Sequence, residues 1–118
     1  MNKKIISIDG PSGSGKERIS KYIARKYNFY HLDSGILYRR LSYLIIKHKV
    51  DINNKNNLSV FLKSIKKISN RKHQILRKEN ISKNTSYIAT KPIIRKFINQ
   101  IQKKTVNKIL RSNKGCVI

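Results

Sequence analysis

Residues 5–20, IISIDGPSGSGKERIS, decide the fold of this chain. The apolar run at 5–8 predicts a strand, a glycine-rich turn follows it, and apolar residues at helical spacing resume after Lys16. Residues 10–16 match the phosphate-loop pattern G-x-x-x-x-G-K, with the strand before it and the helix after it that the pattern requires. The stretch therefore predicts a phosphate-binding turn between a strand and a helix.

The residue types of this turn have physical reasons. Glycines allow consecutive backbone N–H groups to converge on phosphate oxygens, and the helix N-terminus adds the positive end of its dipole. Lys16 adds a cation for the β- and γ-phosphates. The pattern continues with Ser or Thr, whereas this chain has Glu17, which opposes a polyphosphate, and then Arg18, which partly offsets it. The alternative is a Gly/Ser-rich connector that binds no ligand.

Composition limits the class of protein. A chain of 118 residues is one domain at most, and 28 basic against 5 acidic residues give a formal net charge of +23. Such a charge suggests a polyanionic partner. The lysines are scattered along the chain, however, so a uniform compositional bias explains them equally well. The aromatic residues mostly stand at core-like spacing, and nucleic-acid binding is therefore possible but not favoured.

Cysteine and histidine content argues against a metal centre. One cysteine, Cys116, excludes an internal disulfide and a cysteine metal cluster, and it fits a reducing cytoplasm. His31, His48 and His73 are too far apart to suggest a ligand set. No window reaches the roughly 18 apolar residues of a membrane span, and the N-terminus lacks a signal-peptide pattern. We expect a cytoplasmic protein without a metal-ligand set of its own.

Periodicity predicts the remaining elements. The first helix, at about 15–27, is expected to bury Ile19, Ile23, Ala24 and Tyr27, and Asn28 is expected to end it. A second helix begins with Asp33 or Ser34 as its N-cap, and its expected apolar stripe is Ile36, Leu37, Leu41, Leu44 and Ile45. The further expectations are an extended segment at 29–32, the second helix to about 48, a polar loop at 51–57, a helix at 58–68, one or two short strands within 69–83, a helix at 92–111 and a strand at 116–118.

The final three residues begin an apolar, β-branched run and the chain ends within it. Two interpretations are open. Either these residues pair beside the first strand and finish a minimal sheet, or the chain is the front portion of a larger fold. We favour the second, since a complete domain seldom stops three residues into an apolar strand.

Three further stretches resemble one family. Residues 30–39, YHLDSGILYR, resemble the L-D-S-G-x-x-Y-R segment of bacterial cytidylate kinases, at the expected distance after the glycine loop. Ser86 precedes Pro92 by six residues and Arg95 follows it by three, as in that family. Residues 114–118, KGCVI, resemble the start of the strand that leads in the family to a Gly-Arg-Asp motif. The resemblance covers nearly the whole chain.

The resemblance implies an α/β fold of the phosphate-loop, nucleoside monophosphate kinase type, with a parallel sheet, flanking helices and an incomplete C-terminal part. Residues 1–118 would form a single domain with a CMP-binding insert at about 50–90. The implied activity transfers the γ-phosphate of ATP, with Mg²⁺, to CMP or dCMP.

The resemblance also implies site residues. Lys16 would be the catalytic residue, Ser34 and Arg39 would contact the nucleoside monophosphate with Arg39 on its phosphate, and Ser86 and Arg95 would recognise the cytosine ring. Taken singly, these residues have ordinary explanations as a helix cap, a turn residue and surface charges; taken as a spaced set they favour a site. The implied ATP contacts are Gly10, Pro11, Ser12, Gly13, Ser14, Gly15, Lys16, Glu17 and Arg18.

Roughly half of the family's length would follow the last strand, including its lid arginines. Because one arginine of this kind contributes about 10³–10⁵ in rate in related phosphoryl transfers, we expect impaired turnover unless a C-terminal half or a partner chain supplies them. The rival hypotheses are a basic module that binds RNA or another polyanion, and a kinase fragment without function.

Overall fold

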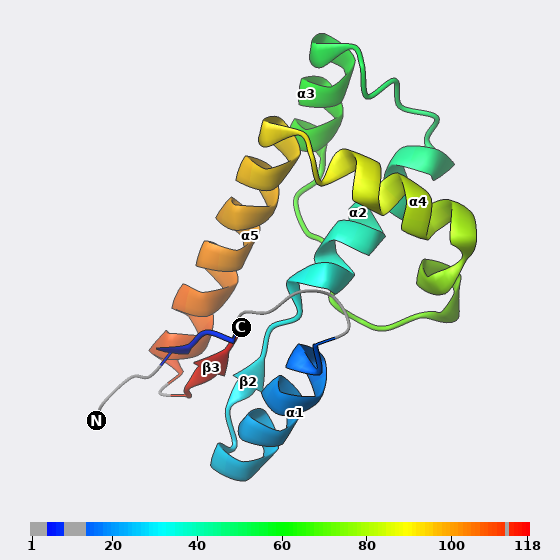
Figure 1. Cartoon of the computed structure of the whole chain (residues 1–118). Helices are drawn as coiled ribbons and strands as arrows, with labels where there is room; N and C mark the ends of the chain where they lie inside the picture. The colour runs from blue at the N-terminus through cyan, green and yellow to red at the C-terminus, as the bar shows by residue number, and fades with distance from the viewer. Residues whose placement is uncertain (1–4, 9–13, 113) are drawn as a thin grey trace. The chain divides into compact units, whose positions relative to one another are not determined.

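The computed structural model describes residues 5–8, 14–112 and 114–118 (Figure 1). Its elements divide into two compact units, residues 1–33 with 100–118, and residues 34–99. The described part of the chain combines helices with a parallel sheet, and the predicted α/β fold class is confirmed. In chain order the elements are β1 (Ile5–Ile6), α1 (Lys16–Tyr27), β2 (Tyr30–His31), α2 (Ser34–Lys47), α3 (Lys55–Ser64), the 3₁₀ helix η1 (Gln74–Arg77), α4 (Glu79–Ile88), α5 (Pro92–Arg111) and β3 (Cys116–Val117).

The sheet of the first unit has β3 at its centre. Its order is β1-β3-β2, and Cys116 lies opposite Ile5 on one side and Tyr30 on the other, both pairs parallel. The Leu32 amide donates to the Val117 carbonyl at 2.8 Å. Cys116 and Val117 have no exposed surface. The strand predicted at the end of the chain is therefore the buried middle of the sheet.

Helix α1 packs on β2 and β3, and its buried face differs from the predicted one (Figure 1). Ser20 and Ala24 are buried and Ile23 is half-buried, whereas Ile19 is 49% exposed and Tyr27 is 56% exposed. The prediction was right for Ala24 and Ile23 and wrong for the other two. Ser20 and Ala24 stand one helical turn apart, and such small side chains let the helix backbone come close to the sheet.

Asn28 ends α1 as predicted. Its φ of 54° is left-handed, a conformation that asparagine tolerates, and its amide donates to the Ala24 carbonyl. The chain then turns directly into β2. Phe29, the residue at this turn, lies against Gly115, which precedes β3: a Cβ placed on Gly115 would come closer than 3.0 Å to three carbons of the Phe29 ring.

The second unit has α2 and α4 as its main packed pair. The buried face of α2 is Ile36, Leu37, Leu41, Ser42 and Ile45, so the predicted apolar stripe is largely confirmed. Against it α4 buries Ile81 and Ile88. The second helix was thus predicted correctly in extent and in its face.

The strands predicted within residues 69–83 are wrong. This segment contains the 3₁₀ helix η1 and the start of α4. Ile81 and Ile88 are seven residues apart, which is two helical turns, and both are buried on one side of α4. The adjacent apolar pair Ile75-Leu76 suggested a strand instead, so this helical spacing was not recognised in the sequence. The third helix also begins earlier than predicted, at Lys55, because the side chain of Asn54 accepts a hydrogen bond from the Asn57 amide at 3.1 Å and caps it.

We predict that Gly115→Ala destabilises the first unit by about 1–3 kcal/mol, because the new methyl group displaces the Phe29 ring. Urea unfolding followed by circular dichroism measures the change. In a Phe29→Ala background the same glycine substitution is expected to have less than half that effect. Equal effects in the two backgrounds would contradict the steric explanation.

Candidate functional site

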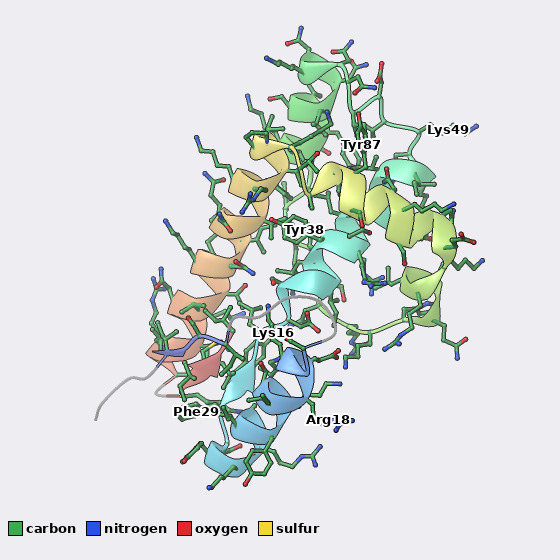
Figure 2. All side chains as sticks on the ribbon, in the orientation of Figure 1. Lys16, Arg18, Phe29, Tyr38, Lys49 and Tyr87 are labelled. Atoms are coloured by element: carbon green, nitrogen blue, oxygen red, sulfur yellow. The ribbon has the colours of Figure 1, made fainter. Side chains whose placement is uncertain are left out.

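Helix α1 begins with a glycine that the geometry requires. Gly15 has φ 86° and ψ 8°, a left-handed conformation that L side chains rarely adopt, and it is the N-cap residue of α1. Lys16 is the first residue of the helix and is half-buried (Figure 2). The positive end of the helix dipole and the lysine charge therefore coincide here. Ser14 is exposed just before them, and Gly10, Pro11, Ser12 and Gly13 lie outside the described residues.

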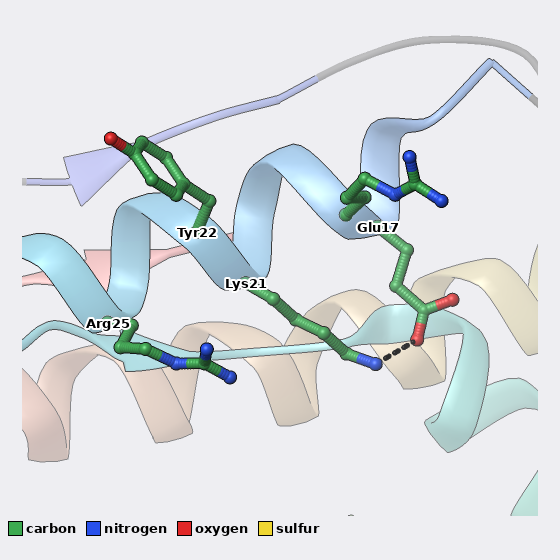
Figure 3. A pocket seen from close by; sticks show the side chains of 5 residues that line it. Glu17, Lys21, Tyr22 and Arg25 are labelled. Carbon is green, nitrogen blue, oxygen red and sulfur yellow. Dashed lines mark ion pairs between the residues drawn. The ribbon is translucent and has the colours of Figure 1, made fainter.

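The two residues that depart from the loop pattern follow on α1. The Glu17 carboxylate is 3.0 Å from the Lys21 ammonium, one turn further along the helix, and both side chains are about half exposed. Arg18 is exposed. With Tyr22 and Arg25 these residues line a surface pocket of about 460 Å³ (Figure 3). Because Lys21 pairs with Glu17, the carboxylate opposes an anion less strongly than its position in the sequence suggests.

Arg39 reaches from α2 to the segment that precedes and begins α4. Its Nη1 donates to the Leu76 carbonyl at 3.1 Å and to the Ser82 hydroxyl at 3.3 Å. Both acceptors are neutral. The positive charge of the guanidinium is therefore oriented without being compensated by a carboxylate at these two contacts.

A second polar contact joins α2 to α4 about one turn further along α2, at residues on either side of Ser82. The buried Ser42 hydroxyl donates to the Ile81 carbonyl at 3.2 Å and accepts from Asn84 Nδ2 at 2.8 Å. A buried hydroxyl with both a donor and an acceptor partner specifies one register between two helices. This contact therefore fixes the segment of α4 that Arg39 meets.

The four residues implied for the monophosphate site are placed differently. Ser86 donates to the Ser82 carbonyl at 3.3 Å, so Arg39 and Ser86 meet at the same residue of α4. Ser34 is the first residue of α2, after Asp33, and is half-buried. Arg95 is exposed on α5. Among the described residues, no hydrogen bond joins the side chain of Ser34 or Arg95 to Arg39.

No sequence pattern pointed to four of the residues that make these contacts: Ser42, Leu76, Ser82 and Asn84. The signal for Ser82 was its spacing of four from Ser86, which on a helix places both on one face. Because that segment was expected to contain strands, the spacing carried no meaning there. The carbonyl of Leu76 has no sequence signal, since any residue supplies one.

The described residues offer little chemistry beyond these cations. Within residues 5–8, 14–112 and 114–118, no group of three or more His, Cys, Asp or Glu side chains could hold a metal ion. Burial raises the pKa of the Cys116 thiol above its ordinary value, which keeps it protonated and unreactive. No helix in the described part is long and apolar enough to cross a membrane.

Known proteins match this chain over most of its length. A family model described as cytidylate kinase matches residues 6–117. The cytidylate kinase of Mycoplasmopsis synoviae (strain 53) is 34% identical over 123 residues, covering 96% of this chain and 55% of that protein. The cytidylate kinase of Aquifex aeolicus (strain VF5) is 35% identical, covering 86% of this chain and 50% of that protein.

A two-function protein also matches. The bifunctional pantoate ligase/cytidylate kinase of Prochlorococcus marinus (strain AS9601) is 37% identical over 116 residues, covering 86% of this chain and 23% of that protein. The chain thus spans about half the length of the single-function relatives it matches. The family resemblance seen in the sequence is confirmed.

We predict that Ser42→Ala lowers the free energy of unfolding by about 1–3 kcal/mol, because Asn84 and the Ile81 carbonyl each lose a partner in a partly dry contact. The matched control is Ser112→Ala, which removes an exposed hydroxyl that donates to the carbonyl of Ile109, three residues earlier. It is expected to change the free energy of unfolding by less than about 0.5 kcal/mol. Thermal and urea melts of both variants test this. Equal losses in the two would contradict the role given to Ser42.

Proposed function

This chain belongs to the cytidylate kinase family, and from that membership we propose that it binds ATP and a cytidine monophosphate for phosphoryl transfer. The γ-phosphoryl group of ATP would pass to CMP or dCMP, giving ADP and the nucleoside diphosphate. The match over residues 6–117 carries the proposal. Further support comes from the left-handed Gly15 directly before Lys16 and from the uncompensated guanidinium of Arg39.

The ATP phosphates would lie on residues 10–18, with Lys16 as the catalytic cation. The geometry supporting this is a helix N-terminus that begins at a left-handed glycine, where free N–H groups and the dipole favour an anion. The Lys21 partner of Glu17 reduces the repulsion expected from that carboxylate. The carboxylate of Glu17 is paired with Lys21, which makes it a poor ligand for a metal ion. We therefore propose that Mg²⁺ enters bound to ATP, as part of the substrate.

The monophosphate would lie against Ser34, Arg39, Ser86 and Arg95. A guanidinium binds a phosphate through two parallel N–H bonds, so Arg39 suits the phosphate better than a lysine would. The shared contact of Arg39 and Ser86 with Ser82 supports a common site for two of these residues. Ser86 and Arg95 would then discriminate the base.

Phosphoryl transfer requires mainly that the reactants be positioned and that cations surround the oxygens of the transferring group. Lys16 and Arg39 would each supply one such cation, on the donor and the acceptor respectively. Because the chain spans about half of its relatives' length, we propose that turnover needs residues from a further segment or a partner chain. The proposal includes a cytoplasmic location, which one unpaired cysteine suits.

A second candidate function rests on the outer face of α1. Tyr22 is 63% exposed, and Tyr27, which was expected to be buried, is 56% exposed. The Lys26 ammonium lies 5.9 Å from one ring centroid and 5.6 Å from the other. Exposed aromatic rings among cations are the elements of single-stranded RNA binding.

Titration of the wild-type chain with CMP, ATP and random-sequence RNA separates the two functions. We expect saturable CMP binding that raises the melting temperature, because a ligand of the folded state stabilises it. Between about 50 and about 200 mM salt, CMP affinity is expected to fall much less than RNA affinity, whose dependence follows the number of phosphates contacted. A chain that binds RNA steeply with salt and shows no CMP protection would support the second candidate instead.

We predict that Lys16→Ala weakens ATP binding at least tenfold, about 1.4 kcal/mol, because a charge-assisted phosphate contact is lost. Calorimetry at matched salt measures the affinities. Lys26→Ala is the control, since it removes a lysine from the other end of the same helix. Unchanged ATP affinity in the first variant, or equal losses in both, would remove the phosphate-loop assignment.

A further inference from the structure

Arg39 uses only one of its three nitrogens in the contacts to Leu76 and Ser82. Nη1 makes both bonds, at 3.1 Å to the carbonyl and 3.3 Å to the hydroxyl. A terminal guanidinium nitrogen carries two N–H groups, so both of its protons are used. The remaining donors of Arg39 are the Nε–H and the two N–H groups of Nη2.

Those remaining donors make no hydrogen bond to the residues that the structure describes. Across the described residues, the buried side-chain nitrogen or oxygen atom without a hydrogen-bond partner is Nε of Arg40 and not an atom of Arg39. Because no hydrogen bond from Nε or Nη2 of Arg39 to a described residue is found either, both atoms keep some exposed surface. They form the edge of the guanidinium that binds two oxygens of one phosphate through parallel bonds.

We propose that Ser82 is a positioning residue, whose hydroxyl, with the Leu76 carbonyl, holds Nη1 so that the Nε–Nη2 edge of Arg39 faces the phosphate of the nucleoside monophosphate. This inference rests on the proposed function, in which Arg39 binds that phosphate. It adds the group that orients Arg39 and the edge that Arg39 presents.

Both acceptors are themselves held in place. The Ser82 amide donates to the Lys78 carbonyl at 2.9 Å and its carbonyl accepts from Ser86, so the residue is fixed within the first turn of α4. Leu76 is buried, and its amide donates to the His73 carbonyl at 3.0 Å. An arginine held by two fixed acceptors loses less side-chain freedom when a ligand binds.

The acceptors are also of the right charge. A carboxylate at either position would pair with the guanidinium and compete with a phosphate, whereas a carbonyl and a hydroxyl orient the cation and leave its charge available. The neighbouring Arg40 shows the contrast. Its Nη2 donates to the Arg71 carbonyl at 2.6 Å and its Nε is buried, so the corresponding edge of Arg40 is not open.

The test compares CMP with cytidine, which lacks the phosphate. Calorimetry on the full chain gives the ratio of the cytidine to the CMP dissociation constant, a measure of the phosphate contact alone. Ser82→Ala is expected to lower this ratio about 3- to 10-fold, the range of one ordinary hydrogen bond, with cytidine affinity unchanged. Ser82→Thr keeps the hydroxyl and is expected to retain the ratio.

Two further variants sharpen the result. Ser82→Asp places a carboxylate beside Nη1 and is expected to lower the ratio further than Ser82→Ala. Thr85→Ala is the control, because its hydroxyl bonds to the Ile81 carbonyl within α4. It is expected to keep the wild-type ratio. If Ser82→Ala does not fold, the comparison of Ser82→Asp with Ser82→Thr decides the question.

The outcomes are distinguishable. A wild-type ratio near one contradicts the proposed function and removes this inference with it. A wild-type ratio well above one that Ser82→Ala and Ser82→Asp leave unchanged overturns the inference alone. Equal weakening of cytidine and CMP by Ser82→Ala would assign Ser82 a merely structural role, which also overturns it.

Discussion

The first unit depends on the pairing of β3 with both β1 and β2. The two outer strands pair with Cys116–Val117, and these residues have no exposed surface. The sheet therefore cannot form until residues from opposite ends of the chain meet, which is a contact of high sequence separation and a slow one to make. Because α1 packs on β2 and β3, the position of Gly15 and Lys16 follows from the same pairing.

The second unit depends on hydrogen bonds that lie within the apolar packing of α2 against α4. Ile81 and Ile88 bury against α2, yet burial alone permits α4 to slide along its partner. Ser42 and Asn84 remove that freedom, because a shifted register would leave their buried polar groups without partners. Ser82 then stands where Arg39 can reach it. The orientation of one arginine is in this way a consequence of a buried serine three residues further along α2.

The sequence contained the local features of this fold and few of the tertiary ones. The first strand, the helix that follows Gly15, the face of α2 and the final strand all follow from periodicity and turn chemistry. The buried face of α1 did not, because Ser20 and Ala24 bury through their small size and not through hydrophobicity. Helix α4 was missed because its polar residues, Ser82 and Asn84, make their bonds to α2 and so look like exposed residues in the sequence.

The net charge of the chain does not by itself explain the candidate site, which relies on a few basic residues in particular positions. A net charge of +23 attracts any polyanion, but most of the basic side chains of the described residues are exposed and scattered, an arrangement that favours no particular anion. Selection requires a cation whose direction is fixed and whose charge is left uncompensated. In the site that we propose, Arg39 meets this condition by resting on neutral acceptors, and Lys16 adds its charge at a helix N-terminus. Lys21 does not, because its charge is directed at Glu17. The chemistry that we propose therefore depends on how a few cations are held, which the number of basic residues in the sequence does not reveal.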